Sequence, residues 1–190
     1  MSEMFYEVSI GEAKTQLQIT NVRPEGGPIP DTFAQLTWIP EKGFEVTMWS
    51  FEDQPRAVYF EPNDPVCTDS CMECFLNVFP EMEDKGYMSI EMNPNGAMYF
   101  GFGTSCDDLI RLICQECPVI VPEITRTEKG WVTSYSVPFW FLRLFFPAFE
   151  GKKGDSFRAN FYKCGDLTVQ EHYLSWNKIE QEKLSFHTPQ

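Results

Sequence analysis

The sequence predicts a mostly β protein, an antiparallel β-sandwich of immunoglobulin-like or related jelly-roll-like form, with one or two short helices. Short apolar-rich runs recur along the chain and are separated by turn residues, as expected for many short strands. Aromatic residues make up 15% of the sequence, with 17 Phe among them, and aromatic side chains favour strands. The 190 residues contain no internal repeat and no linker, so we expect residues 1–190 to form one domain.

Nine strands are expected, each bounded by Gly, Pro, Asn, Asp or Lys-rich turns. They cover residues 44–51, 56–60, 71–79, 87–92, 97–102, 119–125, 131–137, 157–163 and 168–174. Residues 107–117 predict a short helix, because apolar residues at helical spacing follow an acidic first turn and precede Pro118. Residues 139–146 follow Pro138 and are almost uniformly apolar, which we interpret as a buried helical turn.

Composition excludes several classes of partner. The net charge of -13 disfavours nucleic acid and anionic membranes, which require clustered Lys and Arg. The sequence has no apolar run of about 20 residues for a membrane span, and its start lacks the layout of a signal peptide. Seven cysteines, an odd number, indicate reduced thiols. We therefore expect a cytoplasmic protein, with a secreted context left open for a trimmed chain.

The cysteines offer a possible zinc site that the strand pattern disfavours. Cys67, Cys71 and Cys74 precede a Cys-Gln-Glu-Cys motif at 114–117, and thiolates bind zinc. However, the odd separation of Cys71 and Cys74 places them on opposite faces of one strand. We therefore expect buried apolar thiols and no metal site. The two histidines, His172 and His187, lie in no nucleophile motif, so no catalytic residue is assigned.

Glu73 is the most informative carboxylate because it lies in an apolar strand. Strand alternation places it on one face with Cys71 and Phe75, and places Met72, Cys74 and Leu76 on the other face. A carboxylate in apolar surroundings needs partners. It either joins a structural hydrogen-bond network or points into a pocket as an acceptor, and the sequence leaves both interpretations open.

A second polar face is predicted on the strand at 157–163. Arg158, Asn160 and Tyr162 share it, and their planar groups suit a ligand with many hydroxyls, although an ordinary solvent face is the alternative. Aromatic side chains that could serve as flat platforms also occur. They are Trp49, Tyr173, Trp176 and Phe186, of which Trp49 and Tyr173 are expected in the core.

Four motifs in series, taken together, resemble carbohydrate-binding module family 9-like domains. They are Asp-Ser-Cys-Met-Glu-Cys-Phe at 69–75, Tyr-Met-Ser-Ile-Glu-Met-Asn-Pro-Asn-Gly at 87–96, Arg-Ala-Asn-Phe-Tyr-Lys-Cys-Gly at 158–165, and Leu-Ser-Trp at 174–176 with Phe-His-Thr-Pro at 186–189. The resemblance implies a β-sandwich that holds a sugar between aromatic faces, with carboxylate and amide groups at the sugar's edge.

Position by position, the resemblance makes Glu73 the acidic contact and Asn160 the amide partner. It places Phe186 and Cys67 where the family has two tryptophans, and a thiol cannot stack on a sugar ring. His187, next to Phe186, is then expected to join the site. Related modules often carry structural calcium, but the sequence has no Asp-x-Asp-x-Asp loop, so no cofactor is expected.

The leading hypothesis is therefore non-catalytic binding of a mono- or oligosaccharide. Its candidate ligand-binding residues are Glu73, Arg158, Asn160, Tyr162, Trp176, Phe186 and His187. The alternative is a carbohydrate-active enzyme, or an accessory domain of one, in which Glu73 performs acid-base work with Glu91 or His187. Haem binding is a third hypothesis, suggested by the fold's distant cytochrome relatives, and would need His or Met axial ligands. The oligomeric state does not follow from the sequence.

Overall fold

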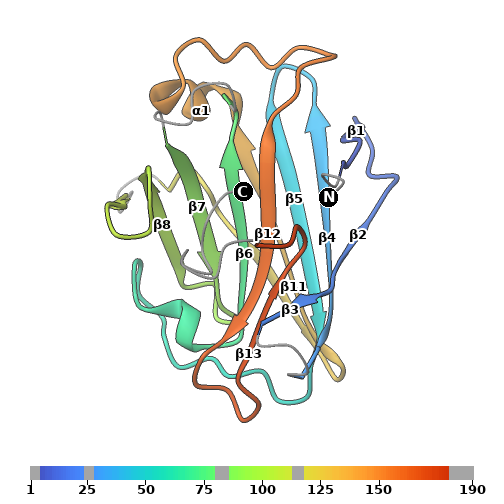
Figure 1. Cartoon of the computed structure of the whole chain (residues 1–190), viewed down its shortest axis with the longest axis vertical. Helices are drawn as coiled ribbons and strands as arrows, with labels where there is room; N and C mark the ends of the chain where they lie inside the picture. Colours follow the sequence, from blue (N-terminus) through green and yellow to red (C-terminus); the bar gives the residue numbers. More distant parts are fainter. Residues whose placement is uncertain (1–4, 24–27, 80–85, 113–117, 180–190) are drawn as a thin grey trace.

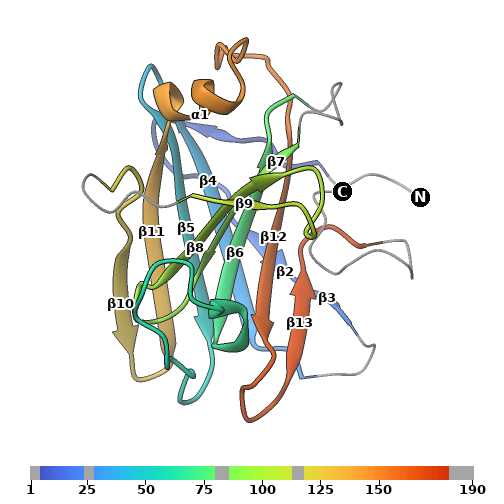
Figure 2. The ribbon, with the colours of Figure 1, turned by 90° about the vertical axis from the view of Figure 1, so that its left-hand side faces the viewer.

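The computed structural model describes residues 5–23, 28–79, 86–112 and 118–179, and in it two β-sheets pack face to face. Figures 1 and 2 show the two layers from directions 90° apart. Almost every strand pairing is antiparallel, the exception being that of β1 with β4. The predicted antiparallel β-sandwich is confirmed.

The first sheet is built around three long strands that lie next to one another. Its order is β1 (Ser9–Ile10), β4 (Asp31–Ile39), β5 (Gly43–Phe51), β11 (Gly130–Pro138) and β10 (Glu123–Thr127), with β2 (Leu17–Ile19) also paired to β4. The β10–β11 hairpin turns at residues 128–129, where the sequence predicts a turn.

The second sheet has β6 at its centre and carries the strands of the predicted site. Its order is β3 (Asn21–Val22), β13 (His172–Ser175), β12 (Arg158–Gly165), β6 (Cys71–Asn77), β7 (Tyr87–Met92), β8 (Met98–Gly103) and β9 (Ile110–Arg111). All residues of β6 and β7 are buried, so both faces of these strands are covered.

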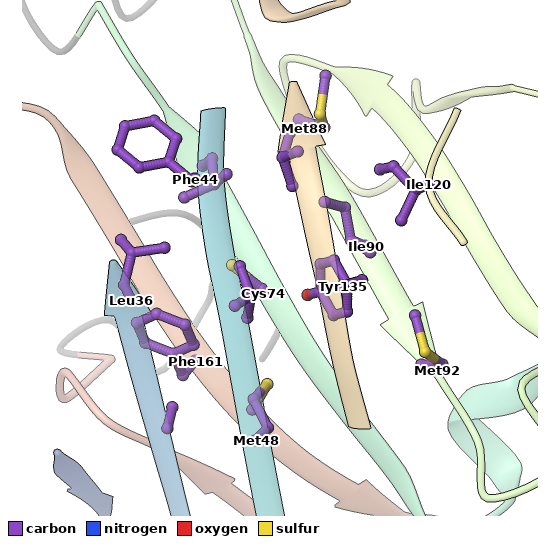
Figure 3. Close-up of a cluster of buried hydrophobic side chains, with 14 of the residues drawn as sticks. Leu36, Phe44, Met48, Cys74, Met88, Ile90, Met92, Ile120, Tyr135 and Phe161 are labelled. Atoms are coloured by element: carbon purple, nitrogen blue, oxygen red, sulfur yellow. The ribbon is translucent and has the colours of Figure 1, made fainter. Parts of the chain in front are cut away.

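The main core lies between the two sheets. Figure 3 shows Met48 and Tyr135 of the first sheet close to Cys74 and Phe161 of the second. Met72, Cys74 and Leu76 all belong to this core, so the predicted inward face of β6 is confirmed. Burial of such side chains contributes roughly 1.5–3 kcal/mol each, which makes this core the principal stabilising element of the fold.

Within the described residues, helical structure is confined to two short segments. Helix α1 (Phe139–Phe145) follows Pro138, as predicted, and covers one end of the sandwich in Figure 1. The segment η1 (Val66–Thr68) is a single 3₁₀ turn that packs near the start of β6. Among the described helices, none has the length and apolar content required to cross a membrane.

The strand predicted at residues 56–60 is wrong, although every other predicted strand overlaps an observed one. Residues 56–60 are not in a strand because side chains take the hydrogen bonds of their backbone. Asp69 Oδ2 accepts from the backbone N–H groups of Val58 (2.8 Å) and Tyr59 (3.2 Å). Asn95 Nδ2 donates to the Tyr59 carbonyl at 2.9 Å.

The helix predicted at 107–117 is also wrong over its described part, residues 107–112. Ile110–Arg111 forms β9 and pairs with β8. The acidic first turn closes a loop instead: Asp108 Oδ1 accepts from the backbone N–H groups of Thr104 (2.9 Å) and Ser105 (2.6 Å). These short-range bonds satisfy the carboxylate without a helix. Residues 113–117 lie outside the described part of the chain.

Candidate functional site

The face of the second sheet that points away from the main core, called here the outer face, carries the predicted polar residues. Strand register aligns Tyr162 on β12 with Glu73 on β6, and Glu73 with Glu91 on β7. The adjacent row contains Asn160, Phe75 and Ser89. Residues from three strands, far apart in the sequence, thus form one continuous surface.

Aromatic side chains surround the carboxylates on the outer face. The Phe75 ring lies 4.8 Å from that of Tyr162 and 5.3 Å from that of Tyr87, centroid to centroid. These rings belong to a second buried cluster. It contains Val66, Cys71, Phe75, Tyr87, Ala97, Tyr162 and Cys164, with Tyr59, Tyr99, Leu109, Tyr173 and Ile179 packed against it. The predicted apolar environment of Glu73 is confirmed.

Two glutamates are buried side by side in these surroundings. The side chain of Glu73 is 0% exposed and that of Glu91 is 8% exposed. One ligand atom from each of Glu73, Glu91 and Cys71 lies within 4.8 Å of the other two. Ser89 Oγ donates to Glu91 Oε1 at 2.7 Å and so orients that carboxylate. The arrangement concentrates acceptor oxygens on a surface that is otherwise apolar.

The neighbouring cysteines are protonated thiols. Burial, followed by the charge of Glu73, raises the pKa values of Cys71 and Cys164 well above the ordinary thiol value. The same two causes, in the same order, raise the pKa of Cys67 to about 12. A nucleophilic cysteine needs a lowered pKa. The environment therefore agrees with the expectation that none of these thiols is a nucleophile.

Asn160 is engaged on both sides of its amide. Nδ2 donates to Tyr162 Oη (3.0 Å) and to the Asn177 carbonyl (3.2 Å). Oδ1 accepts from the backbone N–H groups of Phe161 and Asn177, each at 2.9 Å. All four contacts are within the protein, so Asn160 positions Tyr162 and the chain that follows β13.

The other predicted site residues lie in different places. Arg158 is exposed at the start of β12, opposite Asn77 and beyond the row of Glu73. Trp176 packs in the main core, where its ring contacts those of Phe161 and Tyr6 edge to face, each at 6.3 Å. Leu174 and Trp176 share the face that packs in the main core, so the prediction of Trp176 as an aromatic platform for the ligand was wrong.

The remaining aromatic predictions have mixed outcomes. Trp49 is only partly buried and stacks on Phe33 at 5.6 Å, outside the main core, so its assignment to the core was wrong. Tyr173 packs against the aromatic cluster of the outer face. Phe186 and His187 lie outside the described residues. Cys114 and Cys117 do too, whereas Cys71 and Cys74 lie on opposite faces of β6, as predicted.

Several outer-face residues were not singled out from the sequence. Tyr87, Ser89 and Glu91 occupy every second position of β7 and so share a face, and this period of two was the available signal. Asn177 had no such signal because it contacts Asn160 through its backbone atoms.

A second polar cluster, called here the Lys163 network, lies on the core side of the same sheet. Lys163 Nζ is fully buried and lies 3.3 Å from Glu52 Oε1 and 2.8 Å from His172 Nε2. It also donates to the Cys164 carbonyl at 3.0 Å. Glu52 accepts further hydrogen bonds from Trp131 Nε1 (2.8 Å) and Ser70 Oγ (2.9 Å).

The Lys163 network fixes the charge states of its members. Burial, and then the Lys163 ammonium, lower the pKa of His172 to about 4, so its imidazole is neutral and accepts from Lys163. Burial alone would raise the pKa of Glu52, but Lys163, Trp131 and Ser70 together lower it. The network thus consists of one ion pair and a neutral histidine. Each hydrogen of the Lys163 ammonium has an acceptor, in Glu52, His172 and the Cys164 carbonyl.

Comparison with solved structures supports the fold. A proposed carbohydrate-binding protein from Bacteroides uniformis ATCC 8492 matches with a TM-score of 0.76 at 22% identity, over 92% of this chain and 82% of that one. A carbohydrate binding module family 9 from Caldicellulosiruptor kristjanssonii, in complex with glucose, matches with a TM-score of 0.59 at 11% identity, over 89% and 83%. A carbohydrate binding module family 9 from the same organism, in complex with cellotriose, matches with a TM-score of 0.58 at 10% identity, over 90% of this chain and 80% of that one.

Comparison at the level of sequence identifies the family. Among curated proteins, none matches this chain. The family profile described as carbohydrate-binding family 9 matches residues 41–190. This range includes β5 to β13 and therefore every strand that contributes to the outer face except β3. The expected resemblance is confirmed, and the chain belongs to carbohydrate-binding family 9.

Proposed function

We propose that this protein binds a mono- or oligosaccharide on the outer face around Glu73 and does not transform it. The observation that carries the proposal is the placement of Glu73, fully buried among aromatic rings and aligned with Tyr162 and Glu91, on the fold of this family. The glucose and cellotriose complexes of the structural neighbours support a sugar as the ligand class.

The chemistry of the outer face suits a sugar. An ionised carboxylate accepts hydrogen bonds on two oxygens, which matches a pair of neighbouring hydroxyl groups. Such bonds are stronger in an apolar environment than in water. The rings of Phe75 and Tyr162 add apolar surface for the C–H groups of a sugar. Arg158, Phe186 and His187 remain proposed contacts, and Asn160 is proposed to hold Tyr162 in place.

Burial sets a condition on binding. Glu73 and Tyr162 are fully buried, so a sugar reaches them only when the parts of this protein that cover the outer face move. Opening costs free energy, which lowers the apparent affinity. We therefore expect binding to a small sugar or a chain end, with an association rate below the usual range for a preformed site.

Calorimetric titration with glucose and cellotriose tests the proposal. We expect saturable heats with the unmodified protein and at least a tenfold loss of affinity for Glu73→Gln, which keeps the shape of the side chain but removes its charge. The matched control is Glu45→Gln, because Glu45 is exposed on the first sheet and should leave binding unchanged. Titrations that stay flat for the unmodified protein, across a panel of mono- and disaccharides, would overturn the proposal.

An acid-base role is the second candidate function, favoured by the short separation of Glu73 and Glu91. Retaining glycosidases use two carboxyl groups about 5 Å apart. This candidate predicts turnover of a chromogenic glycoside that disappears in both Glu73→Gln and Glu91→Gln. Absence of turnover, under conditions where a sugar binds, would eliminate it and leave non-catalytic binding.

A further inference from the structure

We propose that the outer face also contains a binding site for a thiophilic divalent cation such as Zn²⁺, formed by Cys71, Glu73, Glu91 and Cys164. These four residues are called here the thiol–carboxylate cluster. The proposal goes beyond sugar binding but shares Glu73 with it. It also differs from the cysteine set considered from the sequence, since Cys74 points into the main core.

Geometry is the first argument. Cys71 and Glu73 are two residues apart on β6 and share a face, and Glu91 lies opposite Glu73 on β7. Their ligand atoms lie within 4.8 Å of one another. With metal–ligand bonds of about 2.0–2.3 Å, ligand atoms around a tetrahedral zinc are roughly 3.3–3.8 Å apart. Side-chain rotations that move the ligand atoms by about 1 Å would therefore bring all three within bonding distance of one ion.

A fourth possible donor lies beside Cys71 on the neighbouring strand. Cys164 on β12 is the register partner of Cys71, and both thiols are fully buried on the outer face. The strand register therefore brings the Cys164 and Cys71 thiols to neighbouring positions on the same face. The four donors come from three neighbouring strands of one rigid sheet, which favours a defined coordination geometry.

The donor chemistry selects the class of cation. Thiolates favour zinc and other soft or borderline metals, whereas calcium and magnesium take oxygen ligands. Two carboxylates this close in a buried site repel each other, and a shared cation would offset that repulsion. The hydrogen bond from Ser89 Oγ to Glu91 Oε1 resembles the outer-shell contacts that orient metal-binding carboxylates.

Absorption spectroscopy with Cd²⁺ tests the cluster, because cadmium bound to thiolate absorbs in the ultraviolet. The full chain is freed of metal with a chelator and titrated with Cd²⁺, and Zn²⁺ is then added as a competitor. We expect a saturable thiolate band that Zn²⁺ displaces. Binding should release protons and weaken as the pH falls, because both thiols must be deprotonated.

Matched variants identify the residues. Cys71→Ala is expected to reduce the affinity for Cd²⁺ at least tenfold, whereas Cys74→Ala, the same change on the core face of the same strand, should leave it unchanged. Glu73→Gln should weaken cadmium binding while keeping the fold, as judged by circular dichroism. A band that is absent in the unmodified protein, or that persists unchanged in Cys71→Ala, would overturn the proposal.

Sugar titrations keep the two proposals separable. Cys71→Ala removes a cation ligand but no proposed sugar contact, so it should retain sugar binding if that function is correct. A protein that binds Cd²⁺ through Cys71 but no sugar would support the cation site and contradict the proposed function. The reverse result would contradict the cation site alone.

Discussion

Asn160 is a buried polar residue whose hydrogen bonds organise the neighbouring part of the outer face. Its amide makes four contacts within the protein, two of them with the backbone of Asn177. Removing one partner of a buried, fully hydrogen-bonded amide lowers the free energy of unfolding, because the remaining polar groups stay buried without that partner. The resemblance to the family suggests that Asn160 contacts the sugar, but its hydrogen-bond pattern favours a positioning role.

Replacing Asn160 should therefore affect stability as well as sugar binding. We expect Asn160→Ala to lower the free energy of unfolding by roughly 2–3 kcal/mol, because it leaves the backbone groups of Asn177 and the hydroxyl of Tyr162 without this partner. Urea denaturation measures the change. Lys178→Ala, an exposed neighbour in the same segment, is the control and should change stability by less than about 0.5 kcal/mol. An equally stable Asn160→Ala protein would contradict the positioning role.

Single residues were predictable wherever strand alternation applied. The face of Glu73, the shared face of Asn160 and Tyr162, and the inward position of Phe161 all follow from a period of two. The prediction for Trp176 was wrong because it relied on the residue type and not on the position in the chain. Trp176 follows the buried Leu174 by two residues and therefore enters the same core.

At the scale of elements, the segment at 56–60, which was predicted to be a strand, is instead held by the side chain of Asp69. Asp69 accepts hydrogen bonds from two backbone amides of this segment and from Asn93 Nδ2 at 2.8 Å, and it lies 3.3 Å from Arg56 Nε. Asp69 is fully buried immediately before β6. One carboxylate thus attaches the segment to the strand that carries Glu73.

Removal of this carboxylate should release the segment. We expect Asp69→Ala to reduce the free energy of unfolding by roughly 3 kcal/mol, because buried donors and the Arg56 guanidinium lose their acceptor. Hydrogen exchange should accelerate at the amides of Val58 and Tyr59. Asp64→Ala is the matched control, since the Asp64 carboxylate accepts an exposed hydrogen bond from the backbone N–H of Glu61. Unchanged exchange at Val58 and Tyr59 would show that Asp69 does not hold this segment.

Strand β4 was not indicated by the sequence because its large apolar residues do not all face inward. In β4 the inward residues include Thr32 and Ala34, whereas the larger Phe33 faces outward and stacks on Trp49. Hydrophobicity therefore does not alternate, even though burial alternates from Asp31 to Leu36. Thr32 Oγ1 finds its partner in Ser50 Oγ at 2.9 Å on the paired strand, a contact visible only once the strands are assembled. The strands β1, β2 and β3 were also missed, and each has only two or three residues.

For the whole molecule, the Lys163 network joins the two sheets through buried charges. Lys163 and His172 belong to β12 and β13 of the second sheet, whereas Trp131 belongs to β11 of the first. Glu52 follows β5 and bonds to groups from both sheets. Gly165 makes room for the His172 ring, because a Cβ there would lie 2.6 Å from His172 Cε1. These polar groups could not be connected from the sequence, since bonded partners such as Glu52 and Lys163 are up to 111 positions apart.

The Lys163 network should make the stability of the sandwich depend on pH. In the unfolded chain His172 takes up a proton near its ordinary pKa of 6.5, whereas in the folded protein its pKa is about 4. The unfolded state therefore binds more protons between these values. The free energy of unfolding should fall as the pH drops from 6.5 to 4, by up to about 1.4 kcal/mol per pH unit from this group. Glu52, whose pKa is also lowered in the folded protein, adds a further loss of stability as the pH falls below 4.5.

Urea denaturation at several pH values between 7 and 4 measures this dependence, and His172→Gln isolates the histidine. Glutamine offers Lys163 an acceptor oxygen but takes up no proton, so the slope of stability against pH should be shallower in the variant between pH 6.5 and 5. Proton resonances of the imidazole give the second readout, since the chain has two histidines and His187→Gln assigns the signals. Equal slopes for the two proteins, or an imidazole of His172 that titrates near 6.5 in the folded state, would show that Lys163 does not hold this histidine neutral.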